Sequence, residues 1–393
     1  MTQLNANAAA NANATASAEI RPFRISIPQA DLDDLKSRLS RTRWPNPLQG
    51  SGWKYGVPLA YVQELAAYWQ DGYDWRKHEA RLNELHQFRT TIDGADIHFI
   101  HVRSPEPNAL PLLLTHGWPS SIVEFLDLIG PLADPRSYGG DPADAFHLVI
   151  PSVPGFGFSG SGLEGGWNIS RIARAWTELM KRLGYDRFGT HGSDLGAMVS
   201  RELGIQRPEG LVGLHVLQLF SFPSGDPAEM ADLSADEMAR LQFLGNFQER
   251  AGFNVIQSTR PQTLSFGLSD SPAGQLTWIA ELFNGFGDHV DAIDRDALLT
   301  NVMLYWLTNT AESSARIYYE NAHNPEQDPQ ARNAAPTGVA VCGQDFKSIK
   351  RFALRDNANV VHWSEFDRGT HFAAMDAPDL LAPDIRTFFR RFR

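Results

Sequence analysis

The spacing of hydrophobic and polar residues changes several times along the chain and predicts alternating strands and helices. Three runs are apolar almost throughout, as in strands buried on both faces, and cover 110–115, 146–150 and 211–217. Apolar residues at helical intervals predict helices over 121–132 and 169–183, and a short strand ends near Asp194 before a helix that runs to about Ile205. This alternation predicts a mostly parallel sheet with helices on both faces.

The alternation stops after residue 221 and resumes near residue 334. Residues 222–333 are polar and helical in pattern, apart from the segment 258–270. The strand pattern returns over 338–342 and 360–366, and a final helix is predicted over 380–392. A sheet of this kind interrupted by one helical insertion is typical of the α/β-hydrolase fold, in which the insertion forms a lid.

The region before the first buried strand has a different pattern, mostly helical and rich in tryptophan. Pro28 opens an amphipathic run that ends near Leu39, and 61–69 repeats the helical period. Residues 91–102 predict a β-hairpin with Asp93 and Gly94 in the turn. The predicted organisation is a disordered tail (1–19), an N-terminal extension (20–103), a first core segment (104–221), a helical lid (222–333) and a second core segment (334–393).

Composition narrows the class of protein. The chain has 393 residues, of which 42% are hydrophobic and 21% charged, as in an ordinary soluble globular protein. The net charge of −11 argues against nucleic acid as the main partner. A single cysteine, Cys342, excludes an intrachain disulfide and fits a reducing compartment. No run approaches the roughly 20 apolar residues that span a bilayer, and the Ala/Asn-rich start does not resemble a signal peptide. We therefore expect a cytoplasmic protein with no membrane anchor, and the pattern favours no particular oligomeric state.

The segment 190–197 carries the first candidate chemistry, a Gly-x-Asp-x-Gly turn around Asp194 between a predicted strand and a predicted helix. The flanking glycines relieve backbone crowding in such a turn, and the free N–H groups of the helix can hold an anion. A carboxylate at this position is ionised at neutral pH and needs no base for its first attack. It suits displacement at an sp³ carbon, such as that of an epoxide or an alkyl halide. Asp194 is therefore the candidate nucleophile.

Three further features fall where the same fold would need them. A turn at 116–119 follows the strand at 110–115, where the N–H groups of Trp118 and Leu195 can form an oxyanion hole. His371 follows the last predicted strand and is the candidate base. The candidates for the acid that orients it are Asp345, Glu365 and Asp367. The order nucleophile, acid, histidine is that of the α/β-hydrolases.

With these residues the chain resembles the microsomal-type epoxide hydrolases over nearly its whole length, from 20 to 393. Its N-terminal region resembles their characteristic extension, which wraps the core and lid. The matching segments are Arg41-Thr42-Arg43-Trp44-Pro45, 116–119, 151–159, 256–264, Asp270-Ser271-Pro272, 301–306 and His371-Phe372-Ala373-Ala374.

The resemblance implies roles for individual residues. It implies that Asp194 is the nucleophile and His371 the base, and it favours Asp345 as the acid because the family's acid follows the strand before the last one. It also implies that Tyr318 in the lid donates a hydrogen bond to the epoxide oxygen. A second lid tyrosine of the family corresponds to Phe253 here, so one of the two donors is missing.

Smaller departures affect the pocket wall. Leu195 stands where the family usually has tryptophan after the nucleophile, and Thr370 stands where glycine usually precedes the histidine. Tyr319 lies about 100° around a helix from Tyr318, so we expect it to point elsewhere. The substrate pocket is expected to include Trp118, Phe253 and Phe158.

The implied activity is hydrolysis of an apolar epoxide to a vicinal diol through an ester on Asp194, as in the detoxification of aromatic hydrocarbons. The reactants are a small-molecule epoxide and water, and the resemblance implies no metal or organic cofactor. Three alternatives remain: a haloalkane dehalogenase, an enzyme that opens the epoxide with an internal nucleophile to make a ring, and a binding protein that has lost the chemistry. Leu195 offers no side-chain donor to a leaving halide. Binding alone would not need Asp194, His371, Asp345 and Tyr318 together.

Overall fold

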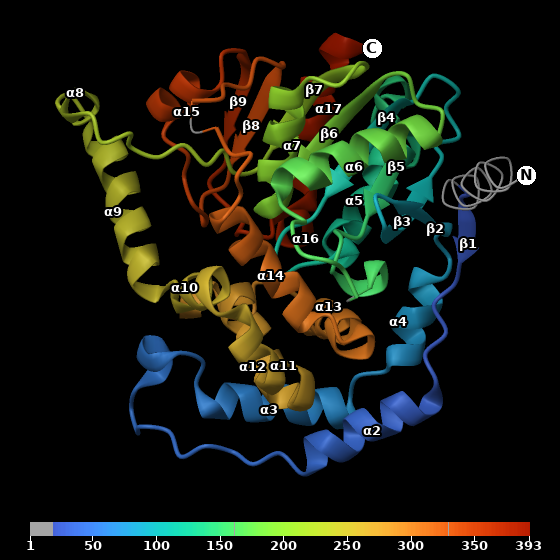
Figure 1. Ribbon diagram of the computed structural model, residues 1–393, viewed down its shortest axis with the longest axis vertical. Coiled ribbons are helices and arrows are strands. Elements are labelled where there is room, and N and C mark those ends of the chain that lie inside the picture. The colour runs from blue at the N-terminus through green and yellow to red at the C-terminus, as the bar shows by residue number, and fades with distance from the viewer. Residues whose placement is uncertain (1–18, 161, 329) are drawn as a thin grey trace, which may run out of the picture.

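The structure is a computed structural model that describes residues 19–160, 162–328 and 330–393, so nearly all of the predicted tail lies outside the described residues. Nine strands in the described part form one sheet, in the order β1-β2-β3-β5-β4-β6-β7-β8-β9 (Figure 1). Their bounds are β1 Arg21–Phe23, β2 Gln87–Ile92, β3 Ala95–Val102, β4 Leu110–Thr115, β5 Phe146–Pro151, β6 Phe188–Gly192, β7 Leu211–Val216, β8 Thr337–Val341 and β9 Val360–Glu365.

Strands β4 to β9 run parallel, which confirms the sheet predicted from the buried apolar runs. Strands β1 to β3 form an antiparallel edge, and β3 joins them to β5. The β2–β3 hairpin turns at Asp93 and Gly94, whose φ angles of 50° and 79° are both positive. This is the geometry that a two-residue hairpin requires, so the predicted turn is confirmed.

The core helices cover both faces of the sheet. Their bounds are α5 Leu126–Ala133, α6 Ile169–Arg182, α7 Leu195–Gln206, α15 Lys350–Asp356, α16 Ala373–Asp376 and α17 Pro378–Phe389. On β6, the Thr190 hydroxyl is bonded to Ser200 of α7, whereas the adjacent Gly189 faces Phe389 of α17. Successive residues of a strand face opposite sides, so α7 and α17 lie on opposite faces.

The chain between β7 and β8 is helical. It contains α8 Pro227–Met230, α9 Ala235–Arg250, α10 Gly252–Thr259, α11 Pro261–Asp270, α12 Pro272–Phe283, α13 Arg295–Thr308 and α14 Ala311–Ala322. The sequence pattern predicted that 258–270 would not be helical. This prediction is wrong, because α11 occupies most of the segment. Helix α11 begins at Pro261, buries Leu268 and packs on α14, so tertiary contacts hold a segment whose own pattern is weakly helical.

The N-terminal extension lies across the lid. Its helices are α2 Gln29–Ser40, α3 Leu59–Asp71 and α4 Trp75–Leu82, and Figure 1 shows α10 to α14 between α2 and α3 on one side and the sheet on the other. Helices α2 and α3 pack against α12, and the Trp69 indole donates to the sulfur of Met303 in α13 at 3.1 Å. One buried cluster runs from Leu35 and Trp69 through β4 to α13, so the N-terminal helices, the sheet and the helices between β7 and β8 share one hydrophobic cluster.

Short 3₁₀ turns join these elements: η1 Gly52–Tyr55, η2 Ile122–Phe125, η3 Pro135–Tyr138, η4 Pro142–Asp144, η5 Gly157–Ser159, η6 Gly285–Gly287 and η7 Arg390–Phe392. The helix predicted over 121–132 is therefore two elements, η2 followed by α5. The helix predicted to reach residue 392 ends as an α-helix at Phe389 and continues as η7.

Candidate active site

Asp194 occupies the turn between β6 and α7, as predicted. Its backbone has φ 49° and ψ −122°, a region that a residue with a side chain adopts at a cost of about 1–3 kcal/mol. A Cβ on Gly196 would overlap the carbonyl of Thr115, and one on Gly192 would overlap the backbone of Gly196. The turn therefore requires both glycines of the motif, and it presents the Asp194 side chain at the ends of the parallel strands.

Three groups contact Asp194. The backbone N–H of Trp118 donates to Asp194 Oδ1 at 2.9 Å, and His371 Nε2 lies 3.5 Å from Asp194 Oδ2. The backbone N–H of Asp194 donates to Gln218 Oε1 at 2.7 Å. The two carboxylate oxygens thus have different neighbours, a backbone donor for Oδ1 and an imidazole for Oδ2. Leu195 is the first residue of α7, where backbone N–H groups have no partner within the helix.

Asp345 is the carboxylate that lies against His371. Its Oδ1 is 2.9 Å from His371 Nδ1, and the Gln218 side-chain amide donates to its other oxygen. Glu365 instead accepts from Arg240 at 2.9 Å, and Asp367 is exposed. Of the three candidate acids, the geometry selects Asp345.

Charges in this cluster reinforce one another. Burial opposes protonation of His371, but the carboxylates of Asp345 and Asp194 outweigh it and raise the pKa of the imidazole well above 6.5. Burial would raise the pKa of Asp345, but His371 and the hydrogen bonds from His371 and Gln218 lower it below the ordinary value. The two carboxylates therefore favour the protonated form of His371 in the resting site.

Aromatic side chains of the lid face Trp118. Phe253 of α10 stacks on the Trp118 ring with centroids 5.5 Å apart, and Tyr318 of α14 meets both rings edge-on, at 5.6 Å and 5.9 Å. Burial and the charge of Asp194 raise the pKa of Tyr318 well above 10, so its hydroxyl stays protonated. Tyr319 is exposed and stacks on His323, as expected from its position on the helix.

Phe158, which was expected to line the pocket, lies elsewhere. Its ring packs against Phe23 of β1 and His98 of β3, with centroids 5.3 Å and 5.2 Å away. The residue that faces the 116–119 turn from the same loop is Phe156, whose ring meets His116 at 5.4 Å. Sequence order placed this loop near the site but did not distinguish which of its phenylalanines faces it.

His116 is a structural residue of the turn. Its Nδ1 is 3.0 Å from the Gly117 carbonyl, and its Nε2 accepts the Val153 N–H at 3.2 Å. Burial lowers the pKa of His116 to about 4, so the ring is neutral and these bonds fix its tautomer. Through them it supports the loop that presents the Trp118 N–H.

Two further polar residues contact the candidate site and were not predicted from the sequence. Gln218 follows β7 and links the Asp194 backbone to Asp345, as described above. Glu124 in η2 is buried, and its carboxylate accepts hydrogen bonds from the hydroxyls of Ser120 and Ser193. Burial raises the pKa of Glu124. The sequence did contain a signal for both residues, because each is a polar residue within an apolar run. An unpaired polar side chain would be costly there, so such a residue is expected to have a buried hydrogen-bond partner.

One other cluster has the residue types of a metal site. His215 of β7, His362 of β9 and Asp384 of α17 bring their ligand-type atoms within 4.8 Å of one another. The Asp384 carboxylate is 2.9 Å from His215 Nε2 and 2.7 Å from His362 Nε2. Hydrogen bonds therefore occupy both carboxylate oxygens, and the cluster is complete as a hydrogen-bonded group inside the core.

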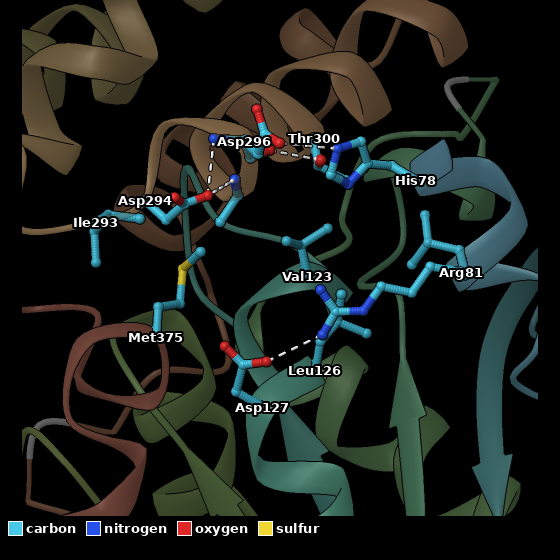
Figure 2. Close-up of a pocket in the computed structure, with 12 residues that line it drawn as sticks. His78, Arg81, Val123, Leu126, Asp127, Ile293, Asp294, Asp296, Thr300 and Met375 are labelled. Atoms are coloured by element: carbon cyan, nitrogen blue, oxygen red, sulfur yellow. Dashed lines mark hydrogen bonds and ion pairs between the residues drawn. The ribbon is translucent and has the colours of Figure 1, made fainter. Parts of the chain in front are cut away.

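A cavity of about 250 Å³ lies between extension, core and lid (Figure 2). It is lined by His78 and Arg81 of α4, Val123 and Asp127, Asp296 of α13, and Met375, and it includes none of the predicted site residues. The polar groups at its rim pair with one another, as in the Arg81–Asp127 ion pair at 3.1 Å. Asp194 and His371 lie outside this cavity and keep 23% and 30% of their side chains exposed.

Comparisons with known proteins identify the family of the chain. A family model described as "Epoxide hydrolase N terminus" matches residues 20–125, and one described as "alpha/beta hydrolase fold" matches 111–260. A protein of Stigmatella aurantiaca is 47% identical over 380 residues, 95% of this chain and 86% of that protein. Epoxide hydrolase 1 of Sus scrofa is 33% identical over 402 residues, 94% of this chain and 88% of that protein.

Solved structures give the same result. The juvenile hormone epoxide hydrolase of the silkworm Bombyx mori superposes with a TM-score of 0.87 at 27% identity, covering 95% of both chains. The epoxide hydrolase of Aspergillus niger superposes with a TM-score of 0.82 at 30% identity, covering 96% of this chain and 98% of that one. Within the described ranges, no helix is both long and apolar enough to cross a membrane.

Proposed function

The chain belongs to the epoxide hydrolases of the α/β-hydrolase superfamily, and on that premise we propose that it opens an apolar epoxide to a vicinal diol through an ester on Asp194. The observation that carries this proposal is the placement of one carboxylate between two kinds of partner. Asp194 Oδ1 accepts the Trp118 N–H, whereas Oδ2 faces His371 and is the oxygen that attacks.

In the first step, Asp194 Oδ2 attacks an epoxide carbon from the side opposite the C–O bond. The new bond is an ester, and the electrons of the broken C–O bond remain on the epoxide oxygen. The protonated hydroxyl of Tyr318 donates to that oxygen as its charge develops. The protein contributes position and electrostatics, and the strained ring supplies the driving force.

Formation of the ester also changes the charge on His371. The Asp194 carboxylate is one of the two groups that raise the pKa of His371 in the resting site. An ester carries no charge, so alkylation removes this contribution and lowers the pKa of the imidazole. The imidazolium then gives its proton to the new alkoxide, and the neutral ring that results is the base for the second step.

In the second step, His371 Nε2 takes a proton from water, and the resulting hydroxide attacks the ester carbon of Asp194. The former Oδ1 becomes the oxyanion and lies against the N–H groups of Trp118 and Leu195. Collapse of this intermediate breaks the ester bond, and His371 gives the proton that it took from water to the departing alkoxide. The Asp194 carboxyl group then passes its own proton to His371, which restores the ion pair, and the diol leaves. Asp345 holds the imidazole in position throughout.

The surroundings of the carboxylate favour an apolar substrate. Trp118, Phe253 and Tyr318 present aromatic faces, and Phe247 and Phe286 extend them along the lid.

We also propose that 222–333 acts as the lid over this substrate. The buried thiol of Cys342 suits a reducing compartment, and we propose a cytoplasmic location.

Isotope labelling tests the ester mechanism. A single turnover of a styrene-oxide-type epoxide by excess enzyme in H₂¹⁸O should give unlabelled diol and one ¹⁸O in the peptide that contains Asp194. After repeated turnover, the label should appear in the diol. The D194N variant serves as the control. Labelled diol in the first turnover, with no label on Asp194, would show that water attacks the epoxide directly and would overturn the proposal.

A further inference from the structure

Glu124 lies between the two loops that build the candidate site. One oxygen of its carboxylate accepts the hydroxyl of Ser120, which follows the oxyanion turn, and the other accepts the hydroxyl of Ser193, which precedes the nucleophile. All three side chains are at most 3% exposed. Water therefore does not compete for these hydrogen bonds, and the carboxylate forms a closed bridge between the loops.

The two loops pack so closely that their relative position must be held accurately. A Cβ on Gly117 would collide with the side chain of Asp194, so the chains are already at their closest approach. Asp194 also adopts a strained backbone conformation, which persists only where neighbouring groups hold it. The Trp118 N–H and Asp194 Oδ1 must nevertheless remain at hydrogen-bond distance for the oxyanion to be stabilised.

The lid fixes the oxyanion loop from its other side. Asn301 of α13 donates to the Pro119 carbonyl at 2.7 Å, and the Tyr305 hydroxyl donates to the Ser120 carbonyl. These bonds anchor the loop to the lid, but they do not reach the turn that carries Asp194. Glu124 connects the Ser193 side chain to Ser120 of the oxyanion loop.

We propose that Glu124 is a positioning residue that sets the distance between the nucleophile and its oxyanion donor by bridging Ser193 and Ser120. The role is geometric and rests on the proposed function. A glutamine at this position preserves the bridge, because its oxygen can accept from Ser193 while its amide donates to Ser120. The Ser120 hydroxyl can then turn toward the Gly117 carbonyl, which lies 3.4 Å away.

The chain offers a matched pair of serines for the test. S193A removes the bridge at the nucleophile turn. S200A removes another fully buried hydroxyl, bonded to Thr190 at 3.0 Å within the same strand and helix. The two variants should lose similar stability in urea unfolding. Only S193A should lose kcat, by roughly 10- to 100-fold with little change in KM, because small misplacements of reacting groups have effects of this size.

A comparison of E124A with E124Q separates the effect of the hydrogen-bonded bridge from the effect of the Glu124 charge. E124A should behave as S193A does, whereas E124Q should retain kcat within about threefold of the wild type because it keeps both hydrogen bonds. Equal losses in S193A and S200A would overturn the proposal in favour of general destabilisation. Equal losses in E124Q and E124A would overturn it in favour of a role for the charge.

Hydrogen exchange gives a readout that needs no turnover. Exchange in the peptide that contains Asp194 should accelerate in S193A and E124A but not in S200A or E124Q. A wild-type enzyme without activity on epoxides would contradict the proposed function, and the exchange data would still decide whether Glu124 holds the turn. Unchanged exchange in S193A would refute the bridge even if activity fell.

Discussion

The Tyr318 hydroxyl is expected to carry most of the donor contribution to ring opening, and Y318F tests this directly. No hydrogen bond holds this hydroxyl within the described part of the chain, so it is available to a ligand. The high pKa of Tyr318 keeps the proton on the oxygen. Phe253, which faces the same Trp118 ring, has no hydroxyl that could replace it.

The magnitude follows from the loss of one donor to developing negative charge. Such a loss costs about 2.7–4 kcal/mol, which corresponds to roughly 10²–10³ in rate. The phenylalanine ring would keep the edge-on contacts with Trp118 and Phe253, so the free energy of unfolding should change little. The loss should appear in the rate of ester formation and not in the rate of ester hydrolysis.

Rapid-quench mass spectrometry of the Asp194 peptide measures ester formation and hydrolysis separately. Y319F is the matched control, because Tyr319 is exposed on the same helix and stacks on His323. We expect Y319F to form the ester at the wild-type rate. Ester formation in Y318F within about threefold of the wild type would refute the reasoning, because it would leave no room for a donor contribution of this size.

Four further predictions concern the same site. F253Y should accelerate ester formation on a panel of epoxides, and an unchanged or lower rate would show that no donor is missing there. D345N should let the ester accumulate, since loss of the acid that orients a catalytic histidine lowers kcat by about 10⁴ in comparable triads; equal slowing of both steps would contradict this. The raised pKa of His371 should stabilise the fold fully below its ordinary value of 6.5 and lose this contribution as pH rises through the elevated value, so urea unfolding of wild type and H371Q should converge at alkaline pH. G196A should fail to fold or should lose activity, because its Cβ would overlap the Thr115 carbonyl; a stable, active variant would disprove the tight turn.

The sequence carried enough information to predict the sheet and the positions of the catalytic groups along it. Apolar runs such as 110–115 identify buried parallel strands, and a turn directly after such a strand must lie at the edge where active sites of this fold form. Asp194, Trp118, Asp345 and His371 all follow strands in this way. Their proximity is therefore a consequence of parallel topology, and it could be predicted without coordinates.

Other features depend on three-dimensional packing and left weaker signals. Glu124 and Gln218 act on residues 69 and 24 positions away, and only the folded chain brings those partners together. Helix α11 is held by packing on α14 rather than by its own periodicity. Phe158 and Phe156 are two residues apart in an irregular loop, so no strand or helix period could decide which of them faces the turn at 116–119.

In the proposed mechanism, the charge distribution of the site favours one order of the chemical steps. While Asp194 is ionised, it raises the pKa of His371, and an imidazolium cannot remove a proton from water. In the proposed mechanism, ester formation neutralises Asp194 and removes its part of the rise in the pKa of His371, at the moment when a carbonyl becomes available for attack. Asp345 remains ionised beside the ring and keeps the pKa of His371 from falling far. We therefore expect the charge of Asp194 to disfavour activation of water before the nucleophile reacts, and its loss to favour hydrolysis afterwards.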